Sequence, residues 1–177
     1  GLASASLYDE PFLAAVPMQH ALATQDSVTT EQLKKETMLL LGTGHCFRDH
    51  VLEVCPEFAR FASNAEGIRK SFEGSSLETI KHMVAAGMGV TLVPRLSVPR
   101  SALDGSADNS QDLGDASFVH YLPFDGDPPT RRVVLAWRRS FTRYEAIAAL
   151  RNAVYACALE GVKRLSWRRH RAFTKRS

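Results

Sequence analysis

Cysteine is scarce in this chain, and long apolar runs are missing from it. The 177 residues include three cysteines, an odd number that does not indicate a framework of paired disulfides. No stretch approaches the roughly 18 consecutive apolar residues of a membrane span. Residues 1–6 lack the charged start and apolar centre of a signal peptide. These absences favour a chain that works in the reducing cytoplasm, where a disulfide is transient and redox-sensing.

Acidic residues are missing from the C-terminal end. From residue 163 onward there are seven basic residues and no acidic one, which leaves 15 basic against 19 acidic residues elsewhere, a net charge of −4. The rest of the chain therefore lacks the basic character typical of nucleic-acid-binding domains. We expect residues 163–177 to form a basic, disordered tail, because short charged termini are usually solvated. With 45% hydrophobic residues, the remainder can bury the core of one or two small domains.

Apolar runs and helical patterns alternate along the chain. Short apolar runs bounded by Pro or Gly predict strands at residues 11–16, 38–41, 68–72, 90–93, 118–122 and 132–137. Caps and helical spacing predict helices that begin near residues 29, 45 and 76, and an amphipathic helix over 142–159 with Cys157 in a core or interface. Residues 101–117 are rich in Gly, Asp and Ser and predict a flexible surface loop. This alternation favours an α/β fold with a largely parallel sheet.

A strand, a turn and a helix are predicted around Cys46. The apolar run at 38–41 is followed by Gly-Thr-Gly at 42–44, so Cys46 is expected in the first turn of the helix that follows. Unpaired backbone N–H groups and the helix dipole favour negative charge there. The thiol should therefore lose its proton more easily, and the thiolate is its reactive form. The charged or titratable residues close to it in sequence are His45, Arg48, Asp49 and His50.

Cys55 lies nine residues after Cys46, and this spacing prevents a disulfide within an intact helix. Nine helical steps rise about 13.5 Å and end half a turn away, whereas a disulfide needs Cα atoms about 5.5 Å apart. If the two thiols bond, the segment has to unwind, and the pair would then form a redox switch. Pro56 disfavours helical geometry at the residue before it, so Cys55 is expected at a helix end or in a loop. The simpler alternative is that both cysteines are buried apolar side chains.

The cysteine segment resembles the redox centre of the hydrogen-peroxide-sensing LysR-type transcription regulators, the OxyR family. The shared motif is Gly44-His45-Cys46-Phe47-Arg48-Asp49, with a second cysteine after eight intervening residues. Residues 75–94 resemble the helix–Gly–strand signature of LysR-type effector domains. Residues 20–23 resemble their His-Pro-Leu-Ala turn, with Ala at the Pro position. The similarity runs from about residue 8 to about residue 162.

This resemblance implies a periplasmic-binding-protein-like effector domain of two α/β subdomains. Residues 12–129 would form most of the second regulatory subdomain, with the redox centre, and residues 1–11 and 130–162 would be parts of the first. We find no counterpart of the winged helix-turn-helix or of the opening strands of the first subdomain.

The resemblance also implies roles for individual residues. Cys46 would be the peroxidatic thiol, oxidised to a sulfenic acid, and Cys55 the resolving thiol that forms a reversible disulfide with it. The residues expected in the peroxide pocket are His45, Arg48, Asp49 and Arg132. For Arg132, an exposed cation on an edge strand is an equally good interpretation.

The implied partners follow from the same family. They are hydrogen peroxide, further copies of the chain in a homodimer or homotetramer, DNA through an N-terminal domain absent here, RNA polymerase, and a thiol reductant that resets the switch. Oxidation would change subunit pairing and activate antioxidant genes. We expect no cofactor, no metal, no membrane association and no enzymatic turnover.

Three other functions remain open on the sequence. A zinc site made of His45, Cys46, His50 and Cys55 lacks the spacing of a short Cys-x2–4-Cys knuckle. A thiol peroxidase would use Cys46 in the same way, but the chain has no Cys-x-x-Cys motif and no visible reductant site. An ordinary effector domain would bind a small organic ligand in its cleft, and ligand-induced stabilisation without a peroxide response would indicate it.

Overall fold

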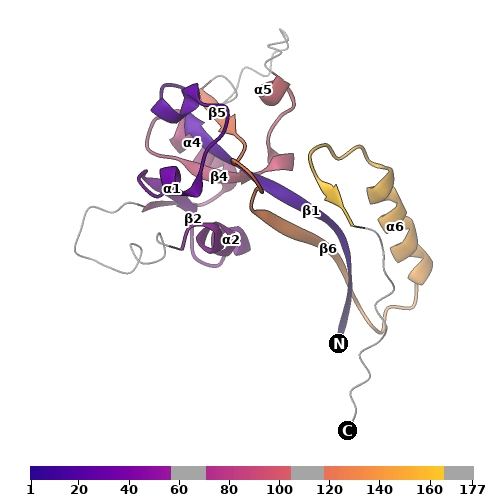
Figure 1. Cartoon of the computed structure of the whole chain (residues 1–177). Helices are drawn as coiled ribbons and strands as arrows, with labels where there is room; N and C mark the ends of the chain where they lie inside the picture. Colours follow the sequence, from indigo (N-terminus) through magenta and orange to yellow (C-terminus); the bar gives the residue numbers. More distant parts are fainter. Residues whose placement is uncertain (57–70, 105–117, 166–177) are drawn as a thin grey trace. The chain divides into compact units, whose positions relative to one another are not determined.

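The computed structural model describes residues 1–56, 71–104 and 118–165 of the chain (Figure 1). The chain forms two compact units. The larger unit is Pro11–Arg131, and the smaller unit combines Gly1–Glu10 with the residues from Arg132 onward. These limits lie within two residues of the boundaries expected from the sequence. The assignment of the two units to regulatory subdomains stays a prediction.

The strands of the larger unit belong to two sheets, which a single bridge connects. Its strands in chain order are β1 (Leu2–Pro17, which begins in the smaller unit), β2 (Met38–Leu41), β3 (Ser71–Gly74), β4 (Thr91–Pro94) and β5 (Val119–Leu122). β1 lies between β4 and β5 and is antiparallel to both, whereas β2 and β3 pair in parallel. A parallel bridge between Met38 and Val90 connects β2 with the residue before β4.

The prediction of largely parallel pairing is therefore wrong for β1. Helices follow β2 and β3 along the chain, and such crossovers return the next strand in the same direction, which gives the parallel sheet of β2 and β3. β1 instead runs opposite to the two strands beside it. The alternation of strands and helices indicates crossovers, but it does not show between which strands the first strand lies.

Six described helices belong to the larger unit, and two of them begin at caps that the sequence indicates. The six are η1 (Ala21–Thr24), α1 (Thr30–Leu33), α2 (Cys46–Val54), α4 (Leu77–Ala85), η2 (Arg95–Ser97) and α5 (Ser101–Asp104). Thr29 and Gln32 form a capping box at α1, and the Ser76 hydroxyl accepts a hydrogen bond from the Thr79 N–H at α4. α5 occupies the start of the segment predicted as a loop, and residues 105–117 lie outside the described residues.

A continuous apolar core fills the larger unit. Every residue of β2 and β4 is buried, as is typical of strands covered on both faces. α4 adds Ile80 and Val84 to this core, and α2 adds Phe47 and Val51. Strand β2 is thus the buried support from which the chain turns into α2.

The smaller unit has little buried apolar surface. It joins the first part of β1 to β6 (Thr130–Arg138), α6 (Tyr144–Ala156) and β7 (Lys163–Arg164). Helix α6 has no buried residue, and Cys157 at its C-cap is exposed, so Cys157 does not lie in the core, and its predicted alternative place in an interface stays a prediction. The predicted amphipathic face exists in the sequence, but the described residues do not cover it.

The basic tail begins later than expected. β7 pairs antiparallel with β1, with Lys163 opposite Asp9. The prediction of a disordered tail from residue 163 is therefore wrong for its first residues, because they pair with a strand far away in sequence. Residues 166–177 lie outside the described residues.

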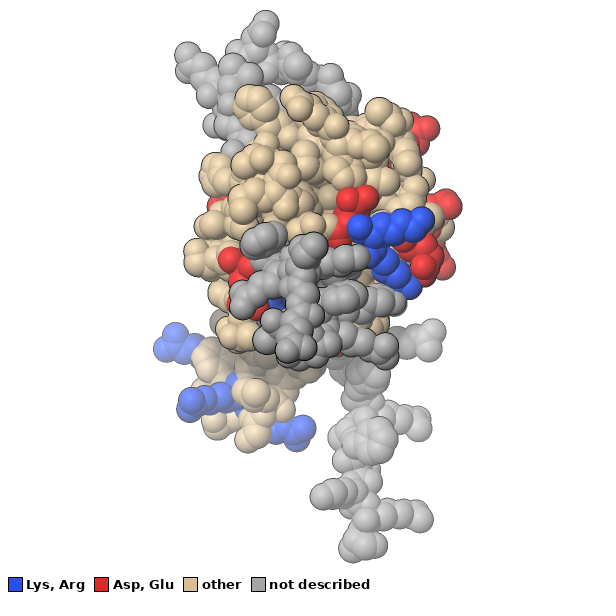
Figure 2. All heavy atoms as spheres, turned by 90° about the vertical axis from the view of Figure 1, so that its left-hand side faces the viewer, with Lys and Arg blue, Asp and Glu red and all other residues tan. Residues whose placement is uncertain are grey.

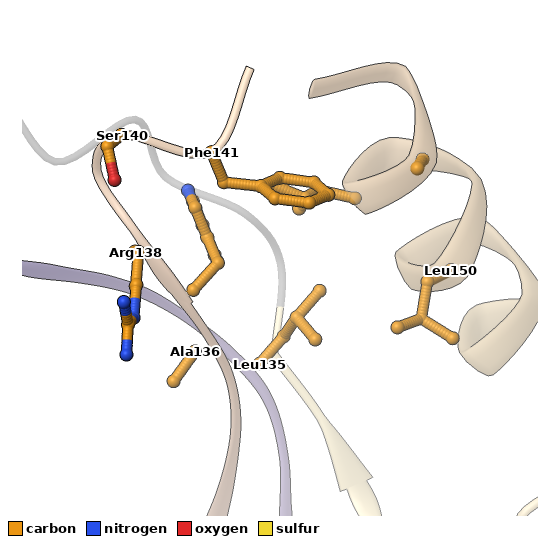
Figure 3. A pocket seen from close by; sticks show the side chains of 9 residues that line it. Leu135, Ala136, Arg138, Ser140, Phe141 and Leu150 are labelled. Carbon is orange, nitrogen blue, oxygen red and sulfur yellow. The ribbon is translucent and has the colours of Figure 1, made fainter. Parts of the chain in front are cut away.

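An apolar hollow of about 450 Å³ lies between β6 and α6. It is lined by Leu135, Ala136, Trp137, Arg138, Ser140, Phe141, Ala146, Ile147 and Leu150. In Figure 3, Leu135 from β6 and Leu150 from α6 extend into the same hollow. The exposure of α6 follows from this arrangement, since its apolar side chains face a space that the described residues leave open. None of the described helices has the length and apolar character needed to cross a membrane.

Candidate redox site

The predicted strand, turn and helix around Cys46 are confirmed. β2 ends at Leu41, and Gly44 has a φ of 95°, a left-handed conformation that glycine adopts without strain. The His45 N–H donates to the Gly42 carbonyl oxygen across this turn, at 3.4 Å. α2 then begins at Cys46, with His45 as its N-cap residue. The local sequence therefore places the thiol at the helix start, where negative charge is favoured.

Cys46 is exposed, and so is His45 before it, whereas Phe47 after it is buried. His45 makes no side-chain hydrogen bond to cap the helix. Asp49 is exposed in the first turn, where an acidic side chain is favourable with the helix dipole. The arrangement leaves the sulfur of Cys46 open to a small oxidant from solvent.

Cys55 lies at the opposite end of the same helix and is fully buried. It is the C-cap residue of α2, as the sequence predicts for a helix end, and its N–H donates to the Val51 carbonyl oxygen at 2.9 Å. Its relative exposure is 0%, and neither it nor Cys46 is in a disulfide. An unbroken helix separates an exposed thiol from a buried one, so the two sulfurs can meet only if α2 unwinds.

Arg48 holds α2 against the sheet. Its side chain is 9% exposed, and Nη1 donates to the Leu41 carbonyl oxygen at 2.9 Å and to Glu73 Oε1 at 2.7 Å. Two helical steps place Arg48 about 200° around the axis from Cys46. A role for Arg48 in the peroxide pocket stays a prediction, and this geometry gives the side chain a structural task instead. Sequence analysis had no signal for Glu73, its partner on β3.

The two adjacent arginines of β6 have different surroundings. Arg132 pairs with Asp9 in the smaller unit, through Nε to Oδ1 at 2.8 Å and Nη2 to Oδ2 at 2.9 Å. This hydrogen bond with Arg132 lowers the pKa of Asp9 and raises the pKa of the guanidinium. Arg131 lies in the larger unit, with its guanidinium carbon 5.8 Å from the ring centroid of Phe47. Arg131 is thus the β6 arginine that contacts α2, and the sequence analysis did not identify it.

Strand geometry explains why the sequence did not separate Arg131 from Arg132. Neighbouring residues of a strand point to opposite faces, so only one of the two can contact the redox helix. Which face points there depends on the register of β6, which the sequence pattern leaves open. The role predicted for Arg132 in the pocket stays untested, and its observed bonds engage it elsewhere.

His50 packs against the apolar core through Phe12. It is half-buried on α2, and its ring lies 6.3 Å from that of Phe12 between centroids, at an interplanar angle of 36°. Phe12 also contacts Phe47 edge to face at 5.5 Å. Nδ1 of His50 is buried and has no hydrogen-bond partner among the described residues.

The zinc alternative finds no support in the part of the chain that the structure describes. No group of three or more His, Cys, Asp or Glu side chains there is placed to hold a metal ion. Figure 2 shows one face of the molecule, on which charged side chains lie scattered among uncharged ones and the described atoms form no continuous basic surface. This agrees with the negative net charge of residues 1–162.

Comparisons with known proteins point to one family. The LysR substrate binding domain matches residues 1–108 of the chain. The DNA-binding transcriptional dual regulator OxyR of Escherichia coli K12 is 36% identical over 146 residues, and the hydrogen peroxide-inducible genes activator of Pectobacterium carotovorum subsp. carotovorum is 35% identical over 145. Each alignment covers 80% of this chain and 42% of the relative, so the chain spans less than half the length of these relatives.

Solved structures show the same similarity. The reduced form of OxyR from N. meningitidis superposes with a TM-score of 0.78 at 36% identity, covering 94% of this chain and 70% of that one. The reduced form of the OxyR regulatory domain from Pseudomonas aeruginosa gives a TM-score of 0.66 at 36% identity, covering 88% of this chain and 66% of that one. The predicted α/β regulatory fold is therefore confirmed.

Proposed function

This chain belongs to the LysR substrate-binding domain family, and from that premise we propose that it is the redox-sensing region of a hydrogen-peroxide-responsive transcription regulator of the OxyR type. One observation carries the proposal. An exposed thiol begins helix α2 and a buried thiol ends it. Such a pair is inert toward itself until the helix breaks, which is what a switch requires.

The chemistry needs only the two cysteines and the oxidant. The thiolate of Cys46 attacks one oxygen of hydrogen peroxide, an S–O bond forms, the O–O bond breaks, and hydroxide leaves. The resulting sulfenic acid reacts with the thiol of Cys55, which forms the S–S bond and releases water. The sulfur pair loses two electrons, and one peroxide molecule is reduced. A thiol reductant then returns both cysteines to thiols.

The free energy needed to unwind α2 determines how easily the disulfide is reduced. Closing a ten-residue loop contributes about 2.7 kcal/mol in the chain-entropy model. Exposing Phe47 and Val51, both buried on α2, costs roughly 1.5–3 kcal/mol each. Together the two side chains cost about 3–6 kcal/mol, which is more than loop closure contributes, so the oxidised form is strained and readily reduced, as regulatory disulfides are.

Arg131 is the better candidate for the cation near the reacting sulfur. It lies over Phe47, the residue that follows Cys46, whereas Arg132 is bonded to Asp9. His45 and Asp49 remain candidates for the peroxide pocket because both are exposed beside Cys46. A positive charge at this place favours the thiolate.

The remaining parts of the proposal concern the whole regulator. It would bind DNA through a domain outside this chain, assemble as a homodimer or homotetramer in the cytoplasm, and act with RNA polymerase. Unwinding of α2 would change the surface that subunits share, and so carry the signal to the DNA-binding domains. No cofactor takes part in this scheme.

Thiol mapping before and after peroxide treatment tests the proposal. Intact mass should fall by the mass of two hydrogen atoms in the protein that retains all three cysteines, and peptide mapping should find Cys46 joined to Cys55. In the Cys55→Ser variant a sulfenic-acid probe should label Cys46, while Cys157→Ser, the matched control, should keep the disulfide. Label mainly on Cys157 would contradict the assignment.

Hydrogen exchange tests the switch itself. Oxidation should strongly change protection in residues 44–56, with smaller changes in α4. A protein with the Cys46–Cys55 bond but an unchanged exchange pattern in this segment would show that no refolding occurs.

A further inference from the structure

One buried polar atom on α2 has no role in the proposed reactions of Cys46 and Cys55. Nδ1 of His50 is shielded from solvent and has no hydrogen-bond partner among the described residues. An unpaired buried nitrogen costs free energy, so such atoms are rare and are found where chemistry uses them. Phe12, itself 1% exposed, packs against the imidazole and restricts its orientation.

The spacing along α2 places His50 on the same face of the helix as Cys46. The two residues are four apart, and side chains at i and i+4 are neighbours on a helix, about 5–6 Å apart between Cβ atoms. Side chains of a helix lean toward its N-terminus, so the imidazole of His50 leans over the preceding turn, where Cys46 lies. A peroxide oxygen attacked by the exposed sulfur would therefore be close to the ring.

His45, exposed beside Cys46, is a second imidazole near the sulfur, and the remaining groups there are less suited to proton transfer. Arg48 is bonded to Leu41 and Glu73 on the far side of the helix. The charged residues that surround His50 are Asp49 and Glu53 on its own helix and Arg131, which lies over Phe47. Phe12, from β1, is neutral. Among these, an imidazole is the group that both accepts and donates a proton near neutral pH.

We infer that His50 is the proton carrier of the peroxide reaction at Cys46, an inference that rests on the proposed function. Nδ1 accepts the proton of the Cys46 thiol. The thiolate then attacks peroxide, the S–O bond forms as the O–O bond breaks, and Nδ1 returns the proton to the departing hydroxide, which leaves as water. Sulfur is oxidised by two electrons, peroxide is reduced by the same two, and the imidazole is regenerated.

The test compares two reactions of Cys46 in a Cys55→Ser, Cys157→Ser background. Peroxide needs a proton on its leaving oxygen, whereas iodoacetamide releases iodide and needs none. The ratio of the two rate constants cancels the thiolate fraction, so it reports protonation of the leaving group. In His50→Gln this ratio should fall about 100-fold near neutral pH, the lower end of the effect of a positioned acid.

Controls separate this inference from the function on which it rests. Glu53→Gln changes a charge on the same helix and should leave the ratio as in the parent. His50→Asn provides a second, shorter amide, and thermal unfolding checks that each variant is folded. Equal ratios in parent and both His50 variants would overturn the role of His50, as would an equal fall in Glu53→Gln. If Cys46 of the parent does not react with peroxide, the proposed function itself is overturned.

Discussion

Helices α4 and α6 are both amphipathic in sequence, yet only α4 buries its apolar face. α4, of nine residues in the larger unit, places Ile80 and Val84 in the core. α6, of thirteen residues in the smaller unit, has none of its residues buried, and Leu150 is 53% exposed. An apolar helical face thus predicts that a surface will be covered, but not which part of a molecule covers it. An exposed apolar face of this kind is typical of a surface that another segment or chain contacts.

The redox segment belongs to the well-packed unit. α2 rests on β2, whose four residues are all buried, and Arg48 fastens it to that strand. A switch that must unwind needs a stable frame to return to, because refolding after reduction depends on contacts that persist outside the helix. The contrast between the two units can be tested by matched substitutions.

A pair of leucines should give the largest difference between the units. Leu40→Ala removes a side chain that is 1% exposed on β2, and it should lower the free energy of unfolding by about 2–5 kcal/mol. Leu150→Ala on α6 should change it by no more than about 0.5 kcal/mol, because the side chain is half exposed. Urea unfolding followed by circular dichroism measures both. Equal losses would show that the smaller unit has a core of its own.

Removal of Arg48 should have an intermediate effect on the larger unit. Arg48→Ala leaves the Leu41 carbonyl oxygen without this donor and breaks the pair with Glu73, and it should destabilise the fold by about 2–3 kcal/mol. Glu73→Gln should cost less than about 1 kcal/mol, since the Glu73 side chain is 49% exposed and its charge is screened. The rate of Cys46 alkylation should change little in Glu73→Gln. A large fall in peroxide reactivity of folded Arg48→Ala, with unchanged stability, would instead support a place for Arg48 in the pocket.

The Asp9–Arg132 pair should give the smallest effect, and that effect depends on pH. Its hydrogen bond lowers the pKa of Asp9 in the folded chain, so the stabilisation is present above the unfolded pKa and is lost as pH falls through the folded value. Asp9→Asn should therefore melt at a slightly lower temperature than the parent at pH 7. At a pH below the lowered, folded-state pKa of Asp9, the two should melt alike. A difference that persists in acid would mean that the substitution disturbs the pairing of β1 with β7 rather than the charge.

Much of the redox site follows from signals within a few residues of Cys46. The apolar run of β2, the glycine at 44 and the proline at 56 set the strand, the turn and the helix end. Caps at Thr29 and Ser76 likewise mark helix starts. The sequence by itself thus determined the helix that separates the two cysteines, because turns and caps act through hydrogen bonds between near neighbours.

Only the tertiary structure decided the direction of β1, the exposure of α6 and the partner of each arginine. Arg48 contacts Glu73, 25 residues away, and Arg132 contacts Asp9, 123 residues away. Which face of β6 presents Arg131 to Phe47 depends on how that strand pairs with β1. Such contacts join segments far apart in the chain, and a local pattern carries no information on which distant surface will complete them.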